Sequence, residues 1–432
     1  MTTVSYKLSE ELSKEMRNLI ELHISSLVTS INSIKPHRSV LNIPNEDLNH
    51  EKQIILSFGK NAAVFADALQ NYMQKKPQKI YVLQAKYYSN LNKEKLSNWF
   101  YYELPHPIPT ETTFKITEKL CKELDKLDEN TVFQVIITGG TSAVLAIPEN
   151  GITAKQYIEI VTSALKQGFD IHELNTIRAL IDRVKAGKFS SKYSKHKIYT
   201  WCISDVISDN PQVIGSGPTV PGIIYSNRAV QWLNRYVEKN KLQININSTN
   251  DIKQFTTTSG DTHCEIILSR KVLLSRLDQH LQNNNINSRI INMSLGGNIE
   301  VVCDAIVEEI IKADNYSTLI WAGEPVVVLN QTINDNSKGG RVSSICTLVA
   351  EKIKQLDNIC FIGIATDGKD GTSPSSGYIV SNHTAKHLIP LGGSYKIIQK
   401  LNTGGVLSSL GYGLTLNQTD INLLDIYMAI IL

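Results

Sequence analysis

The chain has 432 residues, of which 42% are hydrophobic, and its 44 basic against 41 acidic residues give a formal charge of +3 at pH 7. This length predicts two domains, since it exceeds that of one ordinary domain. The even charge, without a long basic run, argues against a nucleic-acid surface, and no run reaches the roughly 20 apolar residues of a membrane span. Glu10, Glu11 and Glu15 interrupt any signal-peptide core. We therefore expect a cytoplasmic protein that binds small molecules, with no nucleic-acid or membrane partner.

Compact apolar runs alternate along the chain with segments of helical periodicity. Strands are predicted at 53–58, 79–84, 132–138, 198–204, 263–269, 288–294, 317–322 and 359–366. Helices are predicted at 7–33, 61–75, 112–128, 154–167, 176–187, 228–239, 271–284, 299–313 and 341–356. This alternation predicts an α/β fold in which helices cover parallel sheets. The polar stretch 240–262 predicts a boundary near residue 255, between domains 1–255 and 256–432.

The cysteines lie in apolar segments and show no C-x-x-C spacing. They are Cys121, Cys202, Cys264, Cys303, Cys346 and Cys360. This pattern predicts reduced, buried thiols and no zinc site.

Four strand-to-helix turns carry residues suited to anion or metal chemistry, because the free N–H groups at a helix N-terminus attract phosphate. The first turn places Lys60 before an Ala-rich helix. Lys60 can hold a phosphate or a substrate carboxylate, or it can be a solvated lysine at a helix start. The second turn, T-G-G-T-S at 138–142, lets backbone amides approach an anion closely, although a plain tight turn explains its glycines equally well.

The other two turns add carboxylates and an arginine. Asp205 follows a predicted strand, where a carboxylate can act as a base, hold Mg²⁺ or simply cap a helix. Asp367 and Asp370 lie between glycines after another strand. Arg341 follows two glycines and can clamp a phosphate or carboxylate with paired hydrogen bonds, or pair with a surface acid.

In this order, the motifs resemble the glycerate 2-kinase family of the type that carries a C-terminal MOFRL domain. The most specific part is S-D-V at 204–206 with S-G-P-T-V-P at 216–221 and T-D-G-K-D-G at 366–371. The other matching segments are S-F-G-K-N-A-A at 57–63, H-P-I-P at 106–109, T-G-G-T-S at 138–142, G-I-T at 151–153, N-T-I-R at 175–178 and G-G-R at 339–341. The resemblance covers nearly the whole chain.

The resemblance implies an N-terminal Rossmann-like doubly wound sheet and a smaller C-terminal MOFRL-type α/β domain. The implied reaction is ATP-dependent phosphorylation of D-glycerate at its 2-hydroxyl, giving 2-phosphoglycerate, with Mg²⁺ or Mn²⁺. A homodimer is compatible with it. We expect one cleft between the domains, on which the loops around 57–61, 138–142, 204–210, 339–341 and 366–371 converge.

Roles follow from the resemblance position by position. Lys60 matches a lysine that contacts phosphate or substrate, and Asp205 matches a base or metal-side carboxylate. Arg341 and Asp367 match the C-terminal domain's contribution, Asp367 being the second metal-side carboxylate. The groups expected around the anionic parts of the ligands belong to Gly139, Gly140, Thr141, Ser142, Ser216, Gly217 and Gly340.

The chain departs from the family pattern in four places. Val342, Ser343 and Ser344 replace N-Q-E after G-G-R, and Thr141 replaces the third glycine of a G-G-G-S turn, where its β-branch is expected to crowd the ligand. The segments 373–377 and 419–423 replace acidic family runs. We expect residues 342–344 to lie in the first turn of a helix that opens onto the cleft, where their side chains reach the nucleotide or metal-bound water, so that their replacement weakens activity. Restoring Asn, Gln and Glu together should raise activity, provided that Thr141 and the segment 419–423 do not block the site.

Three functions stay open on the sequence. The first is an active kinase for a small hydroxy acid. The second is a weakened or inactive family member that binds a nucleotide, an acid or another protein. The third is an oxidoreductase, although no G-x-G-x-x-G with an acid about 20 residues later opens a βαβ unit. Release of ADP with glycerate, binding without turnover, and oxidation of NADH would distinguish the three.

Overall fold

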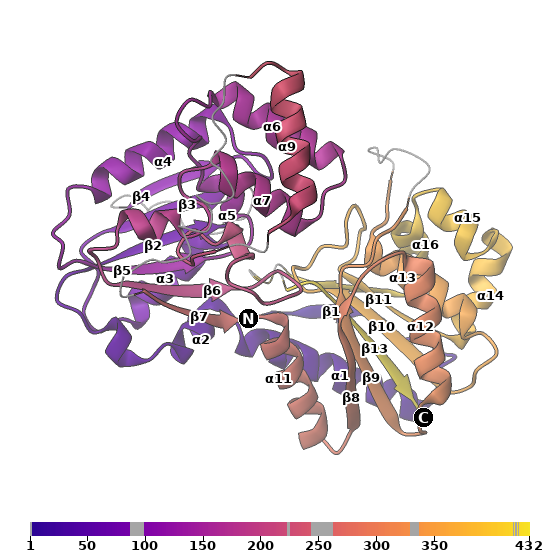
Figure 1. Ribbon diagram of the computed structural model, residues 1–432. Coiled ribbons are helices and arrows are strands. Elements are labelled where there is room, and N and C mark those ends of the chain that lie inside the picture. The colour runs from indigo at the N-terminus through magenta and orange to yellow at the C-terminus, as the bar shows by residue number, and fades with distance from the viewer. Residues whose placement is uncertain are drawn as a thin grey trace. The chain divides into compact units, whose positions relative to one another are not determined.

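The structure is a computed structural model that describes residues 2–86, 99–222, 225–242, 262–328, 337–417, 419, 421 and 423–432. It divides the chain into two compact units (Figure 1). One unit is Pro36–Ser269, and the other combines Met1–Lys35 with Arg270–Leu432.

The Pro36–Ser269 unit contains a six-stranded sheet in the order β4-β3-β2-β5-β6-β7. Its strands are β2 (Gln53–Gly59), β3 (Ile80–Ala85), β4 (Phe100–Leu104), β5 (Val132–Ile137), β6 (Ile198–Ile203) and β7 (Thr262–Leu268). All neighbouring pairs are parallel, as predicted. Numbered within the unit, the order is 3-2-1-4-5-6, that of a Rossmann-like doubly wound sheet. The order reverses between β2 and β5, and open sheets of this kind bind ligands at that switch point.

Helices cover this sheet on both faces. They are α2 (Pro36–Ser39), α3 (Ala62–Tyr72), α4 (Glu111–Leu124), α5 (Thr141–Val144), α6 (Ala154–Lys166), α7 (Ile171–Ile181), α8 (Lys188–Lys192) and α9 (Asn227–Lys239). Leu120 and Leu124 of α4 pack with Leu56 and Phe58 of β2 in the main core of the unit. Because β2 is buried on both faces over its whole length, its apolar residues Ile54, Ile55 and Leu56 follow one another instead of alternating with polar residues. A second apolar cluster joins α6, α7 and α9.

The other unit contains a seven-stranded sheet in the order β1-β12-β11-β10-β13-β9-β8. Its strands are β1 (Val4–Tyr6), β8 (Asn287–Leu295), β9 (Ser317–Gly323), β10 (Ile359–Ala365), β11 (Gly377–Ser381), β12 (Gly413–Leu416) and β13 (Asp425–Ile431). The prediction of a parallel sheet is wrong here, because in the described part only β8 and β9 pair in parallel. The last strand, β13, lies antiparallel between β10 and β9 and requires no crossover helix.

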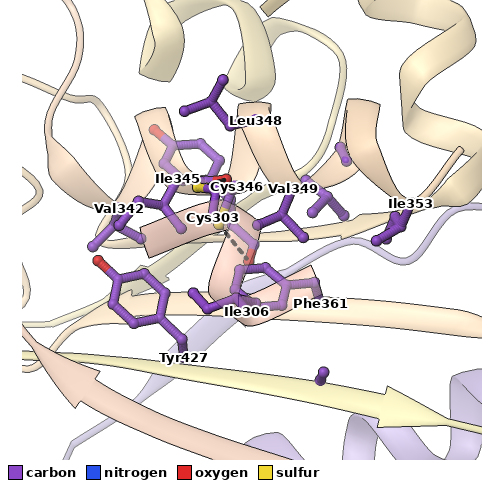
Figure 2. Packing of buried hydrophobic residues seen from close by; sticks show 14 of the residues in the cluster. Cys303, Ile306, Val342, Ile345, Cys346, Leu348, Val349, Ile353, Phe361 and Tyr427 are labelled. Atoms are coloured by element: carbon purple, nitrogen blue, oxygen red, sulfur yellow. Dashed lines mark hydrogen bonds between the residues drawn. The ribbon is translucent and has the colours of Figure 1, made fainter. Parts of the chain in front are cut away.

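Helix α13 lies in the core of this second unit. The helices here are α1 (Lys14–Ser33), α11 (Arg270–Asn283), α12 (Ile299–Lys312), α13 (Arg341–Lys352), α14 (Ala385–Leu388), α15 (Gly393–Gln399) and α16 (Thr403–Ser409). Nine of the 12 residues of α13 are buried. Figure 2 shows Val342 and Cys346 of α13 above Tyr427 and Phe361 of the sheet, with Cys303 of α12 donating a hydrogen bond to the Ile345 carbonyl at 3.9 Å.

The first 35 residues belong to this second unit and not to the predicted domain 1–255. Helix α1 begins at Lys14 rather than at residue 7, because the Ser13 hydroxyl accepts the Met16 N–H at 3.1 Å. The apolar side of α1 packs within the C-terminal unit, and the His23 ring contacts Thr318 of β9. Local sequence patterns do not reveal such distant packing. The expected boundary at residue 255 lies outside the described residues.

All six cysteines are free, and five of them are buried. Within the described ranges, no helix combines the length and apolar character needed to cross a bilayer.

The buried His23 predicts a pH-dependent loss of stability. Its Nδ1 lies 2.7 Å from the Leu19 carbonyl and donates to it, so Nε2 accepts from the Thr318 hydroxyl at 2.7 Å. Burial lowers the pKa of His23 to about 4. The unfolded chain therefore binds a proton first as the pH falls, and the stability that neutral His23 contributes, complete above about pH 6.5, is lost between about pH 6.5 and pH 4.

We expect His23→Gln to lack this component of the pH dependence. Urea unfolding at pH 7, 5.5 and 4.5 measures the slope of unfolding free energy against pH for each protein. The exposed His383, in the same unit, supplies the matched control His383→Gln, whose slope should equal that of the wild type. Equal slopes for wild type and His23→Gln would contradict the assignment.

Candidate active site

Lys60 and Asp205 come together at the switch point of the doubly wound sheet. Lys60 follows β2, and its N–H donates to the Gly139 carbonyl after β5 at 2.8 Å. Asp205 follows β6, and its Oδ2 lies 3.9 Å from Lys60 Nζ, with the two side chains 22% and 17% exposed respectively. A Cβ on Gly139 would lie 1.8 Å from Asp205 Oδ2, so only glycine leaves room for this carboxylate. Three strand ends thus bring these three predicted site residues together.

His106 lies beside the same turn, although it was not among the predicted site residues. A Cβ on Gly140, whose φ is +86°, would lie 3.2 Å from His106 Nε2 and 3.1 Å from Lys60 Cγ. Burial, together with the charges of Lys60 and Arg178, lowers the pKa of His106 to about 4. The ring is therefore neutral near pH 7 and can exchange hydrogen bonds with a ligand without adding charge. The H-P-I-P motif was the available signal for this residue.

A chain of polar contacts leads from the other end of this turn to α7. Ser142 Oγ lies 2.7 Å from Ser216 Oγ, and Ser216 Oγ donates to Asn175 Oδ1 at 2.8 Å. Arg178 Nη1 donates to the same Asn175 oxygen at 3.2 Å. Ser142 and Ser216 were predicted site residues, whereas Asn175 and Arg178 were noted only as part of a motif. Gly217 has a φ of +55° and forms the turn that carries Ser216.

Thr141 faces the protein rather than the side on which a ligand would approach. Its side chain is fully buried, and its hydroxyl lies 2.7 Å from the carbonyl oxygens of both Phe58 and Thr138. The hydroxyl therefore links the ends of β2 and β5. The β-branch of Thr141 was expected to crowd the ligand. It packs against Gly215 inside the protein instead.

In the second unit, Arg341 and Asp367 line one cavity of about 710 Å³. Arg341 Nε lies 2.9 Å from Asp425 Oδ2, and its Nη2 lies 2.8 Å from Glu324 Oε1. Burial raises the pKa of Asp425 to about 7, although the charge of Arg341 opposes this shift. Arg341 thus has two acidic partners that the sequence did not indicate, since Asp425 begins the unpredicted strand β13. Asp367 is partly exposed and accepts the Lys369 N–H at 2.9 Å.

The carboxylate of Asp370 caps the N-terminus of α13. Its Oδ1 accepts from the Val342 N–H and its Oδ2 from the Ser343 N–H, each at 3.0 Å. A Cβ on Gly340 would lie 2.0 Å from Asp370 Oδ1, so Gly340 makes room for this cap. Two of the free N–H groups at this helix end, those of Val342 and Ser343, are therefore bound by a carboxylate of the protein, whose negative charge also suits the helix dipole.

The first turn of α13 does not face the ligand as the sequence comparison suggested. Val342 and Ser343 are fully buried, and the Ser343 hydroxyl accepts the Gly340 N–H at 2.9 Å. Only Ser344, which is 4% exposed, lines the cavity with Arg341. The expectation that all three side chains reach a ligand is therefore wrong, because α13 enters the core at once. Of the segment 419–423, residues 420 and 422 lie outside the described part.

The two groups of site residues belong to different units, each described by itself. Convergence of all five loops on one cleft therefore stays a prediction. Among the described residues, no cluster of three or more His, Cys, Asp or Glu side chains is arranged to hold a metal ion. Mg²⁺ commonly takes only one or two protein carboxylates and completes its shell with phosphate and water oxygens.

Comparison with known proteins places this geometry in a family. Residues 19–249 match a family model described as a domain of unknown function (DUF4147), and residues 317–425 match the MOFRL family. The chain is 26% identical to D-glycerate 2-kinase of Thermotoga maritima, over 96% of this chain and 99% of that protein. The chain belongs to the glycerate 2-kinase family. This family member is also 26% identical to glycerate 2-kinase of Pyrococcus horikoshii, over 95% of this chain and 97% of that protein.

The fold of this glycerate 2-kinase family member is also shared with a solved structure. The crystal structure of glycerate kinase from T. maritima matches it with a TM-score of 0.81 at 24% identity, covering 96% of this chain and all of that chain. The predicted two-domain α/β class is confirmed.

Proposed function

We propose that this family member transfers the γ-phosphoryl group of ATP to the 2-hydroxyl of D-glycerate or of a close small hydroxy acid. The observation that carries the proposal is the Lys60–Asp205 pair, 3.9 Å apart on either side of Gly139 at the switch point. A carboxylate after β6 and an ammonium group after β2, on either side of β5 in the parallel sheet, supply a proton acceptor and a positive charge in one place. Both groups keep part of their surface accessible, so a ligand can reach them.

The reaction assigns a separate task to each side chain. Asp205 accepts the proton of the 2-hydroxyl as its oxygen bonds to the γ-phosphorus, while the bond from that phosphorus to the β-phosphate oxygen breaks and ADP leaves. Lys60 offsets negative charge on the phosphoryl oxygens. The neutral His106 beside Gly140 can hold a substrate hydroxyl by a hydrogen bond.

The residues present fit a divalent cation. Asp205 presents its carboxylate over the bare Cα of Gly139, and Asp367 lines the cavity of the other unit, so either can supply an oxygen ligand. When bound, Mg²⁺ or Mn²⁺ would neutralise charge on the transferred phosphoryl group. In this role Asp205 and Asp367 are proposed as the metal-side carboxylates.

A coupled ADP-release assay over a panel of small hydroxy acids, with Mg²⁺ or Mn²⁺, tests the proposal. We expect turnover with D-glycerate, and we expect Asp205→Asn to lower kcat by about 100-fold to 10,000-fold, because a general base is lost. Asp128→Asn is the matched control, since Asp128 is 63% exposed and pairs only with the surface residue Lys52 in the described chain.

Other outcomes would favour the other two functions. Binding of glycerate and ATP in calorimetry without release of ADP would indicate a ligand-binding member that has lost catalysis. Oxidation of NADH with hydroxypyruvate would indicate an oxidoreductase. Either result would overturn the kinase proposal.

A further inference from the structure

Arg178 is a cation without an acidic partner beside the candidate site. It lies in the last turn of α7 and is partly exposed. Among the described residues, its guanidinium donates to Asn175 Oδ1 at 3.2 Å and has no carboxylate within 4 Å. Two other basic residues nearby in sequence do have acidic partners: Arg183 lies 2.9 Å from Glu118, and Lys188 lies 3.1 Å from Glu149. The charge of Arg178 is thus not neutralised by a direct ion pair in the described chain.

The carboxylate whose charge acts on Arg178 is that of Asp182, which is engaged by other groups. Asp182 is fully buried and accepts from the Tyr157 hydroxyl at 2.7 Å and from the Val184 N–H at 2.9 Å. The same carboxylate acts on the fully buried Lys185, whose pKa burial lowers to about 8. Burial also lowers the pKa of Arg178. Two cations therefore share one carboxylate in this region, which leaves an excess of positive charge that favours an anion.

The position of Arg178 connects this charge to the candidate site within the same unit. Asn175, which accepts from Arg178, also accepts from Ser216, and Ser216 contacts Ser142 in the 138–142 turn. Next to this turn, the positive charges of Lys60 and Arg178 both lower the pKa of His106. Arg178, in α7, and Lys60, directly after β2, thus both act on the His106 ring.

We propose that Arg178 binds the carboxylate of the hydroxy-acid acceptor, an inference that rests on the proposed function. A guanidinium group has five N–H donors, and in the described chain one of them is used by Asn175. The remaining donors match the two oxygens of a carboxylate in a paired geometry that lysine cannot reproduce. The site therefore selects acceptors with a carboxylate next to the reacting hydroxyl and discriminates against neutral diols.

Arg178→Met tests the assignment in the full-length chain. We expect the Kd for D-glycerate, measured by calorimetry, and its KM to rise about 10-fold to 100-fold, the usual effect of losing a charged hydrogen-bonded contact. The Kd for ATP should stay within about twofold, because the nucleotide does not contact this residue in the proposal. Wild type should prefer D-glycerate over D-glyceramide, its neutral amide, and Arg178→Met should lose that preference.

Two further variants separate binding from folding. Arg183→Met removes a half-exposed arginine from the same segment and should match wild type in every measurement. Arg178→Lys keeps the charge without the paired geometry and should show an intermediate Kd for D-glycerate. If Arg178→Met does not fold, the Kd of Arg178→Lys decides, and a wild-type value in that variant overturns the proposal.

The outcomes also distinguish this inference from the proposed function. If wild type binds D-glycerate but releases no ADP, the kinase proposal fails, while loss of that binding in Arg178→Met still supports a carboxylate-binding arginine. If Arg178→Met binds D-glycerate as wild type does, the assignment of Arg178 is overturned, whatever the turnover. Weaker ATP binding with unchanged D-glycerate binding would assign Arg178 to a nucleotide phosphate and would likewise overturn it.

Discussion

Replacing Lys60 with alanine is expected to lower kcat for glycerate phosphorylation by about 100-fold to 1,000-fold and to leave the melting temperature nearly unchanged. The loss follows from removing a positive charge that offsets the phosphoryl oxygens in the transition state. The fold should persist, because the Lys60–Asp205 ion pair is long, at 3.9 Å, and both side chains are partly exposed, so the pair adds little to stability. Coupled ADP release and thermal unfolding of the same preparation measure the two effects.

Lys52→Ala is the matched control for this experiment. Lys52 lies just before β2 as Lys60 lies just after it, and it is 47% exposed in a surface pair with Asp128. Both activity and melting temperature should match wild type. Wild-type turnover in Lys60→Ala, with a normal melting temperature, would return Lys60 to the role of a solvated lysine at a helix start.

Restoring the family's Asn, Gln and Glu at positions 342–344 together is expected to destabilise the protein by about 2–6 kcal/mol rather than to raise its activity. Val342 and Ser343 are fully buried. Asparagine at position 342 would bury an amide among apolar side chains, and glutamine at position 343 would overfill the space beside Thr403, which the Ser343 hydroxyl now contacts at 2.8 Å. Each change costs about 1–3 kcal/mol. Urea unfolding measures the sum.

Ser344→Glu alone separates the site from the core. Because Ser344 lines the cavity with Arg341, a glutamate there can extend into open space, and we expect a loss of stability well below that of the triple variant. Its catalytic efficiency for glycerate then tests whether a carboxylate at this position assists the reaction. A triple variant as stable as wild type would show that positions 342 and 343 lie outside the core.

Five of the six strands of the first sheet were predicted. Four of them, β2, β3, β5 and β6, are buried over their whole length, whereas β7 is buried only at its end. The exception is β4, an edge strand of sequence F-Y-Y-E-L whose side chains are mostly half-exposed and whose short aromatic run was not assigned to a strand. In the second sheet, β1, β11 and β12 have five residues or fewer and give little periodic signal. β13 has a strong apolar pattern and was nevertheless overlooked, and its insertion between β10 and β9 made the sheet mixed.

The part of the candidate site that lies in strand-to-helix turns was predicted from the sequence. The other residues were not, because only tertiary packing brings them to the site. Lys60, Gly139 and Asp205 each follow a buried strand, so strand order alone brings them together. Arg178 was not predicted, because its importance comes from the absence of a partner among the described residues, which sequence spacing does not reveal. The capping role of Asp370 was missed for the same reason, since its carboxylate contacts a helix that begins 29 residues earlier, at Arg341.

The grouping of the first 35 residues with Arg270–Leu432 has a consequence for synthesis on the ribosome. His23 and Thr318 are 295 residues apart. At a synthesis rate of about 5–20 residues per second, the strand that α1 covers is made roughly 15–60 s after α1 itself. The intervening Pro36–Ser269 unit is complete in sequence 49 residues before Thr318 and can fold first. Until then the nascent chain carries α1 without the strand that it covers, so the apolar side of this helix is exposed to chaperones.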